Sequence, residues 1–177
     1  MIKKITSPLS HETIKDLRAG DTVLLSGVIF TARDTAHKRI SELLEHGEHL
    51  PFDIENQTVY YAGPCPAPPG RPVGSVGPTT SARMDPYAPR LISDGLRVMI
   101  GKGSRSRRVI KMICEYSGVY FAAAGGAGAL LSLTVEHAEL AAFADLGPEA
   151  VYKLTVRDMP LVVAVDSFGG NIYKELI

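Results

Sequence analysis

Apolar positions near the start of the chain change their period from one segment to the next. Residues 22–31 form an almost continuous apolar run, TVLLSGVIFT, which predicts a buried strand. Gly27 interrupts this run, which predicts a bulge or a close approach of another backbone. From Asp34 to a stop at Gly47 the apolar spacing becomes i, i+4, i+7 and i+8, which predicts an amphipathic helix capped by Asp34. The stripe consists of Ala36, Ile40, Leu43 and Leu44.

The same alternation of strand-like and helix-like patterns continues through the first two thirds of the chain. Each predicted helix begins at a residue that can cap it, and glycines mark the ends. The predicted strands are residues 56–61, 97–100 and 119–123. The predicted helices are residues 10–17, capped by Ser10, residues 85–95, capped by Asp85, and residues 104–118, capped by Ser104, and a run of small residues at 125–129 opens a further helix.

Towards the C-terminus the pattern is strand-like only. Residues 150–156 and 161–166 predict two paired strands joined across residues 157–160. Alternating strands and helices are typical of a parallel sheet, and consecutive strands add an antiparallel layer. The sequence therefore predicts an α/β fold with mixed sheets, in a single domain that spans residues 1–177.

Composition and charge narrow the classes of partner. Hydrophobic residues make up 45% of the chain and charged residues 21%, which is typical of a soluble globular protein. Lys plus Arg equals Asp plus Glu, at 19 each, so the chain lacks the net charge of a protein that binds nucleic acid or an anionic membrane. No apolar run approaches the roughly 20 residues that span a bilayer, and the N-terminus lacks the apolar core of a secretory signal. We expect a cytoplasmic protein.

The metal-binding residue types are few and scattered. The two cysteines, Cys65 and Cys114, are far from any C-x-x-C spacing, which argues against a disulfide framework and against a zinc or iron–sulfur site made by this chain alone. The five histidines do not form a metal-binding spacing either. The sequence therefore predicts no metal ligands in this chain.

Residues 74–85, GSVGPTTSARMD, concentrate hydroxyl groups around one arginine. Thr79, Thr80 and Ser81 are residue types that cap helices, so this segment predicts backbone N–H groups directed outward, where an anion could accept them. Arg83 follows Thr79 by four residues, so a helical turn would project both side chains from one face. The segment is the main candidate for a binding site.

Three cationic positions lie where a predicted strand is followed by a helix or turn. They are Arg33, the segment from Thr79 to Arg83, and Lys102 in the Gly-Lys-Gly turn. If the strands are parallel, all three open on the carboxyl edge of one sheet, where α/β proteins bind ligands. No acidic partner is evident for them, so they predict an anionic ligand such as a small diacid. The alternatives are that Arg33 pairs with Asp34 or with a later carboxylate and that Thr79 or Thr80 is only a cap.

Two further segments stand out. The predicted helix at 104–118 carries Arg105, Arg107, Arg108 and Lys111, whose charges oppose the helix dipole, so they are either solvated or compensated by an anion. An anion- or RNA-binding module is the alternative function, although Tyr116 is the only aromatic residue near this basic run. Residues 63–72 are rich in proline and predict a stiff surface loop that could act as a lid.

Taken together, the motifs resemble the beta subunit, or carboxy-terminal domain, of class I iron–sulfur fumarases and of the related tartrate dehydratases. The blocks that carry the resemblance are collinear and cover nearly the whole chain. They are residues 26–39 (SGVIFTARDTAHKR), 63–66 (GPCP), 77–85 (GPTTSARMD), 101–103 (GKG), 125–127 (GGA) and 147–150 (GPEA).

This resemblance implies a swivelling β/β/α three-layer domain, with a parallel central sheet and a second antiparallel sheet. It also implies the reversible hydration of fumarate to L-malate. In that family an alpha subunit or amino-terminal domain holds a [4Fe–4S] cluster on three cysteines, so the chain would act as one half of a hetero-oligomeric hydro-lyase. Met84 followed by Asp85, and the Lys-Gly-Ser-Arg that follows Gly101, are more similar to fumarase than to tartrate dehydratase, so the resemblance favours fumarate and leaves L-tartrate as the close alternative.

The resemblance also assigns roles to residues at matching positions. Arg33, Arg83 and Lys102 would bind the carboxylates of the substrate, and Thr79 would be the catalytic base that takes the C3 proton from malate. A threonine hydroxyl can act as a base only where neighbouring positive charge stabilises its alkoxide. His37 lies in the first block, but its place inside a helix indicates a structural role. A non-catalytic role in assembly is the remaining alternative.

Overall fold

The computed structural model describes residues 1–173, and the last four residues of the predicted domain, 174–177, lie outside the described part. The strands are β1 (Ile2–Ser7), β2 (Thr22–Thr31), β3 (Thr58–Tyr60), β4 (Val98–Gly101), β5 (Val119–Ala122), β6 (Val135–Ala142) and β7 (Val151–Val165). The α-helices are α1 (His11–Asp16), α2 (Asp34–Glu45), α3 (Ala88–Ser93), α4 (Arg107–Glu115) and α5 (Gly128–Ser132), and η1 (Ser81–Met84) and η2 (Ala144–Glu149) are 3₁₀ helices. Within the described residues no helix is long and apolar enough to cross a membrane.

The strands form one mixed sheet in the order β1-β2-β3-β4-β5-β7-β6. Strands β1 to β5 are parallel to their neighbours, whereas β7 runs antiparallel to β5, β6 and β2. Because β7 pairs with both β5 and β2, the strands β2, β3, β4, β5 and β7 close into a ring. This confirms the α/β class, and the antiparallel strands predicted as a second sheet are hydrogen-bonded to the parallel ones.

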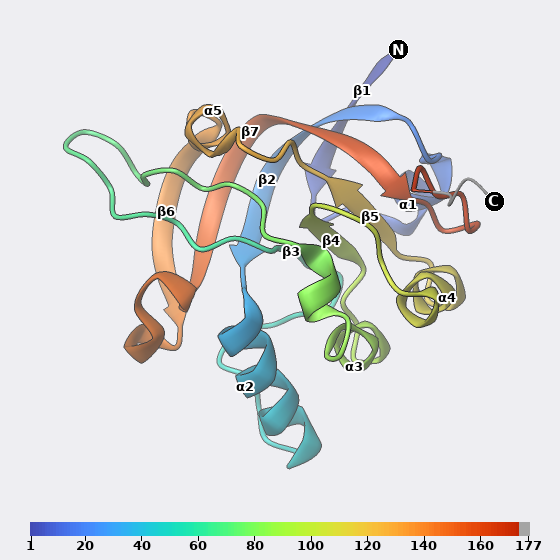
Figure 1. Ribbon diagram of the computed structural model, residues 1–177, viewed down its shortest axis with the longest axis horizontal. Coiled ribbons are helices and arrows are strands. Elements are labelled where there is room, and N and C mark those ends of the chain that lie inside the picture. Colours follow the sequence, from blue (N-terminus) through green and yellow to red (C-terminus); the bar gives the residue numbers. More distant parts are fainter. Residues whose placement is uncertain (174–177) are drawn as a thin grey trace.

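Alternating residues of the strands pack into two separate cores. Tyr60, Ile100 and Phe121 belong to one cluster, which also includes residues of β1, α1, α5 and β6. Their chain neighbours Val59, Met99 and Tyr120 point the other way and pack against helices. The helices α2, α3 and α4 lie together on that side of the sheet (Figure 1). The near-continuous apolar runs in the sequence follow from this arrangement, because a strand buried on both faces has no polar face.

Gly27 makes the close approach that the sequence predicts. Its φ is +102°, and a Cβ at this position would overlap the carbonyl oxygen of Ser7. The pairing of β2 with β7 shifts between Leu25 and Gly27, which is a β-bulge. The bulge and the close approach are both confirmed.

Two predicted helix starts are wrong. The helix predicted from Asp85 begins at Ala88, and Asp85 instead ends η1 and accepts hydrogen bonds from Arg105 and Ser106. Ser106, not Ser104, caps α4 by accepting from the Val109 amide. Both errors have one cause. The Asp85 carboxylate binds Arg105 and so does not cap a helix of its own, and this pairing holds Arg105 outside α4. The cap of α2 differs by one residue, with Arg33 as N-cap and Asp34 first in the helix.

The strand predictions are right for the interior of the sheet and incomplete at its edges. The strands predicted at 22–31, 56–61, 97–100 and 119–123 correspond to β2, β3, β4 and β5. The two strands predicted at 150–156 and 161–166 are one strand, β7, which continues through residues 157–160. The edge strands β1 and β6 were not predicted, because both carry charged residues and expose much of their length.

Candidate functional site

Three parallel strands end at the edge of the sheet where the candidate residues lie. Arg33 follows β2 by two residues, Tyr61 follows β3 directly and Lys102 follows β4 directly. The backbones interlock here, because the Ala32 amide donates to the Tyr60 carbonyl at 3.0 Å and the Tyr61 amide to the Ile100 carbonyl at 2.8 Å. The carboxyl edge predicted for these junctions is therefore confirmed.

Thr79 is held against the end of β3 by two hydrogen bonds. Its amide donates to the Tyr61 carbonyl at 2.7 Å, and its hydroxyl donates to the same carbonyl at 3.0 Å. The residue precedes η1, so it does not share a helical face with Arg83, and Thr80 occupies the N-cap position of η1 without a side-chain hydrogen bond. The predicted helical pairing of Thr79 with Arg83 is wrong. Its hydroxyl proton is engaged with Tyr61, while the oxygen keeps lone pairs that could accept a proton.

Lys102 lies beside the same segment. Thr80 and Lys102 form a parallel bridge, and the Ser81 amide donates to the Lys102 carbonyl at 2.9 Å. Glycine at position 101 permits this contact, because a Cβ there would overlap the Ser81 hydroxyl. The Lys102 side chain is exposed and passes Gly125, whose hypothetical Cβ would lie 4.0 Å from Nζ. The structure thus brings Lys102 next to Thr79 and Thr80 through the backbone.

Arg83 extends from η1 towards the start of α2, where it meets Asp34. Its Nε lies 2.9 Å from Oδ2 of Asp34, and its Nη2 donates to Oδ1 at 3.0 Å. Burial is the largest single effect on Asp34 and would raise its pKa, but the hydrogen bond from Arg83, a backbone hydrogen bond and the charges of Arg83 and Arg33 together hold the pKa below its usual value. The expectation that the candidate cations have no acidic partner is therefore wrong for Arg83, since such a pair across the fold cannot be read from sequence spacing.

Arg33 lies under the loop that follows β3. A Cβ at Gly63 would lie 3.0 Å from Cδ of Arg33 and 2.9 Å from the Pro148 carbonyl, so glycine leaves the passage for this side chain. Its Nε is buried without a hydrogen-bond partner among the described residues, and the Glu149 carboxylate is 3.9 Å away. The guanidinium keeps hydrogen-bonding capacity, and it pairs only loosely with Glu149 rather than with Asp34.

His37 supports Arg33 from within α2. Its ring nitrogen Nδ1 lies 2.8 Å from the Arg33 carbonyl oxygen, and the ring packs edge-on against Tyr61 with centroids 5.1 Å apart. Burial lowers the pKa of His37 to about 4, so the ring is neutral near pH 7. A neutral, buried imidazole between two site-bearing segments agrees with the structural role expected for it.

A buried guanidinium lies beneath the candidate site. The side chain of Arg105 is 0% exposed, and its Nε donates to Asp85 at 2.7 Å. Its Nη2 donates to the Tyr61 hydroxyl at 3.2 Å. The centroids of the Tyr61 and Tyr120 rings lie 5.2 and 4.9 Å from Cζ of Arg105. The prediction that Arg105 belongs to the helix starting at Ser104 is wrong, and of the two alternatives for its charge, solvation does not hold, since the Asp85 carboxylate compensates it. Removing it from that basic run also weakens the RNA-binding alternative.

Arg105 connects the segments that carry the candidate residues. Tyr61 holds Thr79, Asp85 ends the 3₁₀ helix that carries Arg83, and Arg105 itself follows the turn of Lys102. The hydroxyl of Tyr120 adds a second tie, since it donates to the Gly103 carbonyl at 2.8 Å and lies 2.8 Å from the Ser81 hydroxyl. Sequence reasoning missed this network, because Arg105 and Asp85 lie 20 residues apart and no local spacing pairs them.

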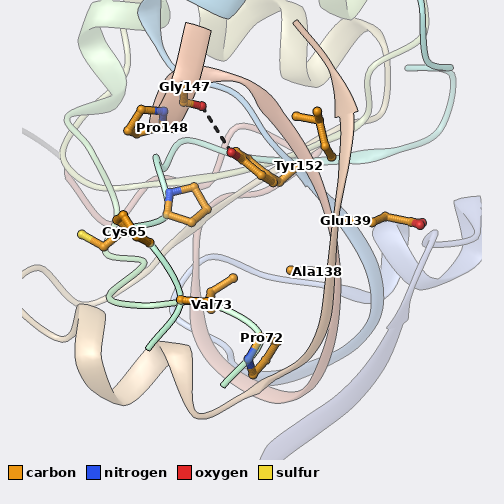
Figure 2. A pocket seen from close by; sticks show the side chains of 12 residues that line it. Cys65, Pro72, Val73, Ala138, Glu139, Gly147, Pro148 and Tyr152 are labelled. Carbon is orange, nitrogen blue, oxygen red and sulfur yellow. Dashed lines mark hydrogen bonds between the residues drawn. The ribbon is translucent and has the colours of Figure 1, made fainter. Parts of the chain in front are cut away.

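The proline-rich loop at 63–72 lines a pocket beside the candidate site. The pocket has a volume of about 350 Å³ and lies between this loop and residues of β6, η2 and β7. Figure 2 shows Cys65, Pro72 and Val73 facing Ala138, Pro148 and Tyr152 across it. None of the four candidate residues lines this pocket. The proposal that the loop acts as a lid stays a prediction.

The donor groups at this edge of the sheet fit a carboxylate and not a metal cluster. They are guanidinium, ammonium and hydroxyl groups, which bind anions, and they include no thiolate. Within residues 1–173 no three His, Cys, Asp or Glu side chains are grouped so that they could hold a metal ion. Cys65 is exposed and Cys114 partly so, and both are free.

Fold and site together define an α/β domain whose strand ring gathers cationic side chains at the carboxyl edge of its parallel strands. Comparison with known proteins identifies the family. Residues 2–176 match the family model described as Fumarase C-terminus, and the chain belongs to this family. The resemblance drawn from the blocks at 26–39 and 77–85 is confirmed.

Curated relatives fall into two kinds. The chain is 41% identical over 178 residues to a protein named putative L(+)-tartrate dehydratase subunit beta from Methanocaldococcus jannaschii, covering 95% of this chain and 89% of that protein. It is 39% identical over 155 residues to the anaerobic class I fumarate hydratase of Escherichia coli, covering 86% of this chain and 28% of that protein. For fumarate hydratase 1, mitochondrial, of Leishmania major the identity is 42% over 154 residues, with the same 86% and 28%. The chain thus spans less than a third of these two fumarate hydratases but most of the tartrate dehydratase subunit.

Proposed function

We propose that this chain is the substrate-binding subunit of a hydro-lyase that adds water to fumarate to give L-malate. The observation that carries the proposal is the placement of Arg33, Arg83, Lys102 and Thr79 at one edge of the parallel strands. Three cations outnumber the two carboxylates nearby, Asp34 and Glu149, so the edge keeps an excess of positive charge for a dianion. The names of its relatives, fumarate hydratase and tartrate dehydratase subunit, agree with such a ligand.

The cations would hold the two carboxylates of the substrate and orient its double bond. Arg83 and Arg33 can each grip a carboxylate with two N–H groups, and Lys102 adds a compact charge. Arg33 has a buried Nε without a described hydrogen-bond partner, which a substrate oxygen or a bound water could satisfy. Binding by several charge-assisted bonds fixes the register of a short, symmetric diacid better than one bond would.

Thr79 is the candidate base. Hydration puts a hydroxyl group on one alkene carbon and a proton on the other, so the reverse reaction requires a group that removes the proton from C3 of malate. The Thr79 hydroxyl would first lose its proton to solvent water, and the resulting Oγ1 alkoxide would then take the C3 proton. The hydrogen bond from the Thr79 amide to the Tyr61 carbonyl, at 2.7 Å, would hold the residue in place in both protonation states, and the positive charge of the neighbouring Lys102 would stabilise the alkoxide.

We further propose that a [4Fe–4S] cluster belongs to a partner subunit, as the motif resemblance implies. The cluster, when bound there, would supply a Lewis acid for the hydroxyl and carboxylate of the substrate. This division of roles is consistent with the anion-binding donors that this chain presents. The partner would then complete the site opposite Thr79.

L-tartrate is the alternative substrate. The sequence favours fumarate through Asp85, but both oxygens of Asp85 are bound inside the chain, by Arg105 Nε and the Ser106 amide. Residue 85 would therefore influence the choice of diacid only indirectly, through the packing of η1. Activity measured on each diacid distinguishes the two.

Reconstitution tests the proposal. The chain is combined anaerobically with a cluster-bearing alpha subunit, and hydration of fumarate and dehydration of L-tartrate are followed separately. We expect activity that depends on both subunits, and we expect Arg83→Ala to lower kcat/KM by about 100-fold or more if Arg83 anchors a carboxylate. A mixture that contains an intact cluster and acts on neither diacid would refute the proposal.

A further inference from the structure

The ion pair between Arg83 and Asp34 uses only one edge of the guanidinium. Nε and Nη2 of Arg83 face the two carboxylate oxygens of Asp34, at 2.9 and 3.0 Å. This is a side-on pairing, which leaves the other edge, formed by Nη1 and the second N–H of Nη2, for another acceptor. Among the described residues no atom accepts a hydrogen bond from Nη1. Arg83 is thus oriented by one carboxylate while it can still receive a second.

Asp34 is well placed to act as a fixed reference for Arg83. It is the first residue of α2, a helix of 12 residues, and it lies next to Arg33, three residues after the end of β2. The positive end of the helix dipole and the Arg83 guanidinium both favour the ionised carboxylate, and the pKa of Asp34 lies below its usual value although burial opposes this. Its partner Arg83 has a long side chain that is 48% exposed and would otherwise sample many rotamers.

We propose that Asp34 is a positioning residue, which holds the guanidinium of Arg83 in the plane and direction needed to grip a substrate carboxylate. The effect on substrate binding rests on the proposed function, whereas the orientation of Arg83 by Asp34 does not. Asp34 itself does not touch the substrate, since both of its oxygens are turned towards Arg83.

A competing role for Asp34 predicts the opposite effect on binding. If Asp34 merely neutralised Arg83, its removal would increase the positive charge of the site and tighten the binding of a dianion. If Asp34 orients Arg83, its removal frees the guanidinium to rotate. Binding of the substrate carboxylate must then order the Arg83 side chain, which weakens the binding. The sign of the change in KM therefore distinguishes the two roles.

Asp34→Asn in the reconstituted enzyme provides the kinetic test. We expect KM for the diacid to rise about tenfold while kcat changes less than threefold, because the carboxylate grip acts in the ground state and the transition state alike. In an Arg83→Ala background, Asp34→Asn is expected to change KM less than twofold, since the group that it orients is gone. An unchanged or lower KM for Asp34→Asn, or the same tenfold rise in the Arg83→Ala background, would overturn the proposal.

Asp145→Asn is the matched control. Asp145, in η2, accepts two hydrogen bonds of 2.8 Å each from Arg39, which lies in α2 like Asp34. It contacts none of the four candidate residues. The control removes a charge of the same sign from a two-bond pair that joins η2 to α2, and we expect it to leave KM within twofold. A control effect as large as that of Asp34→Asn would assign the change to α2 in general and would also overturn the proposal.

A second measurement does not depend on activity. In the ¹⁵N-labelled full chain, the Nε–H signal of Arg83, assigned by its loss in Arg83→Lys, should report restricted motion in the wild type and in Asp145→Asn. It should become mobile in Asp34→Asn. Equal restriction in Asp34→Asn would overturn the positioning role even if the enzyme is active. Conversely, a complex that neither hydrates fumarate nor dehydrates L-tartrate would refute the proposed function, and the signal of Arg83 would still decide whether Asp34 orients it.

Discussion

Replacement of Asp85 by alanine removes the counter-ion of a guanidinium that has no access to water. The Arg105 side chain is 0% exposed and the Asp85 side chain 10% exposed, so the two charges interact in a poorly solvated environment. Removing one partner of a buried pair costs about 3–5 kcal/mol, because the remaining charge stays buried without compensation. The rings of Tyr61 and Tyr120 keep their contact with the guanidinium after the substitution, so we expect the loss to lie at the lower end of this range. We therefore expect Asp85→Ala to lower the free energy of unfolding by about 3 kcal/mol, measured by urea denaturation with unchanged m-value.

The control for this prediction is an exposed pair of similar geometry. Asp145→Ala breaks the two-bond pair with Arg39, in which the Asp145 side chain is 65% exposed, and should cost less than about 1 kcal/mol. A double variant, Asp85→Ala with Arg105→Met, should be more stable than Asp85→Ala alone, since it removes the uncompensated charge. The reasoning is refuted if Asp85→Ala is as mild as Asp145→Ala, or if the double variant is less stable than Asp85→Ala.

Three further predictions concern stability. Gly27→Ala should lower the free energy of unfolding by more than about 1 kcal/mol in urea denaturation, because its φ is +102° and its Cβ would overlap the Ser7 carbonyl, whereas unchanged stability would contradict the close approach. Gly101→Ala should also destabilise the chain and disturb η1, because the added methyl group would overlap the Ser81 hydroxyl; circular dichroism melting would show this, and an unchanged melting temperature would exclude the overlap. The buried His37 has a pKa of about 4 in the folded chain, below the 6.5 of an unfolded histidine, so the unfolded state takes up the proton first. The free energy of unfolding should therefore fall as the pH drops from 6.5 to 4, by up to about 1.4 kcal/mol per pH unit. His37→Asn should reduce this slope, and an equal slope in the variant would assign the effect to other groups.

The interior of the sheet could be predicted from sequence because burial on both faces leaves a strong signal. Strand β2 reads as one apolar run, and the change to helical spacing after Asp34 marks the start of α2. The outer strands carry a weaker signal. Strand β1 contains two adjacent lysines, and β6 buries only Val135 and Ala142 fully, so neither shows a continuous or clearly alternating pattern.

The positions of the candidate residues at the sheet edge could also be predicted, because parallel strands place their carboxyl ends together. Their partners could not. The pair of Arg83 with Asp34 joins residues 49 apart in sequence, and the pair of Arg105 with Asp85 joins residues 20 apart. Such pairs depend on how η1 and the turn after β4 are packed, which no local spacing encodes. The sequence therefore leaves open whether Arg105 is solvated or compensated by an anion, and only the fold shows that it is buried against Asp85.

The closure of the strand ring by β7 has a consequence for synthesis of the chain. Strands β2, β3 and β4, which lead into the candidate residues, leave the ribosome long before residues 151–165 do. Until then β2 and β5 each present an unpaired edge that β7 will later cover, and such edges are templates for aggregation. Nascent chains that stall before β7 should therefore depend on chaperones, and the segment made early reaches its final form only after the last strand has been added.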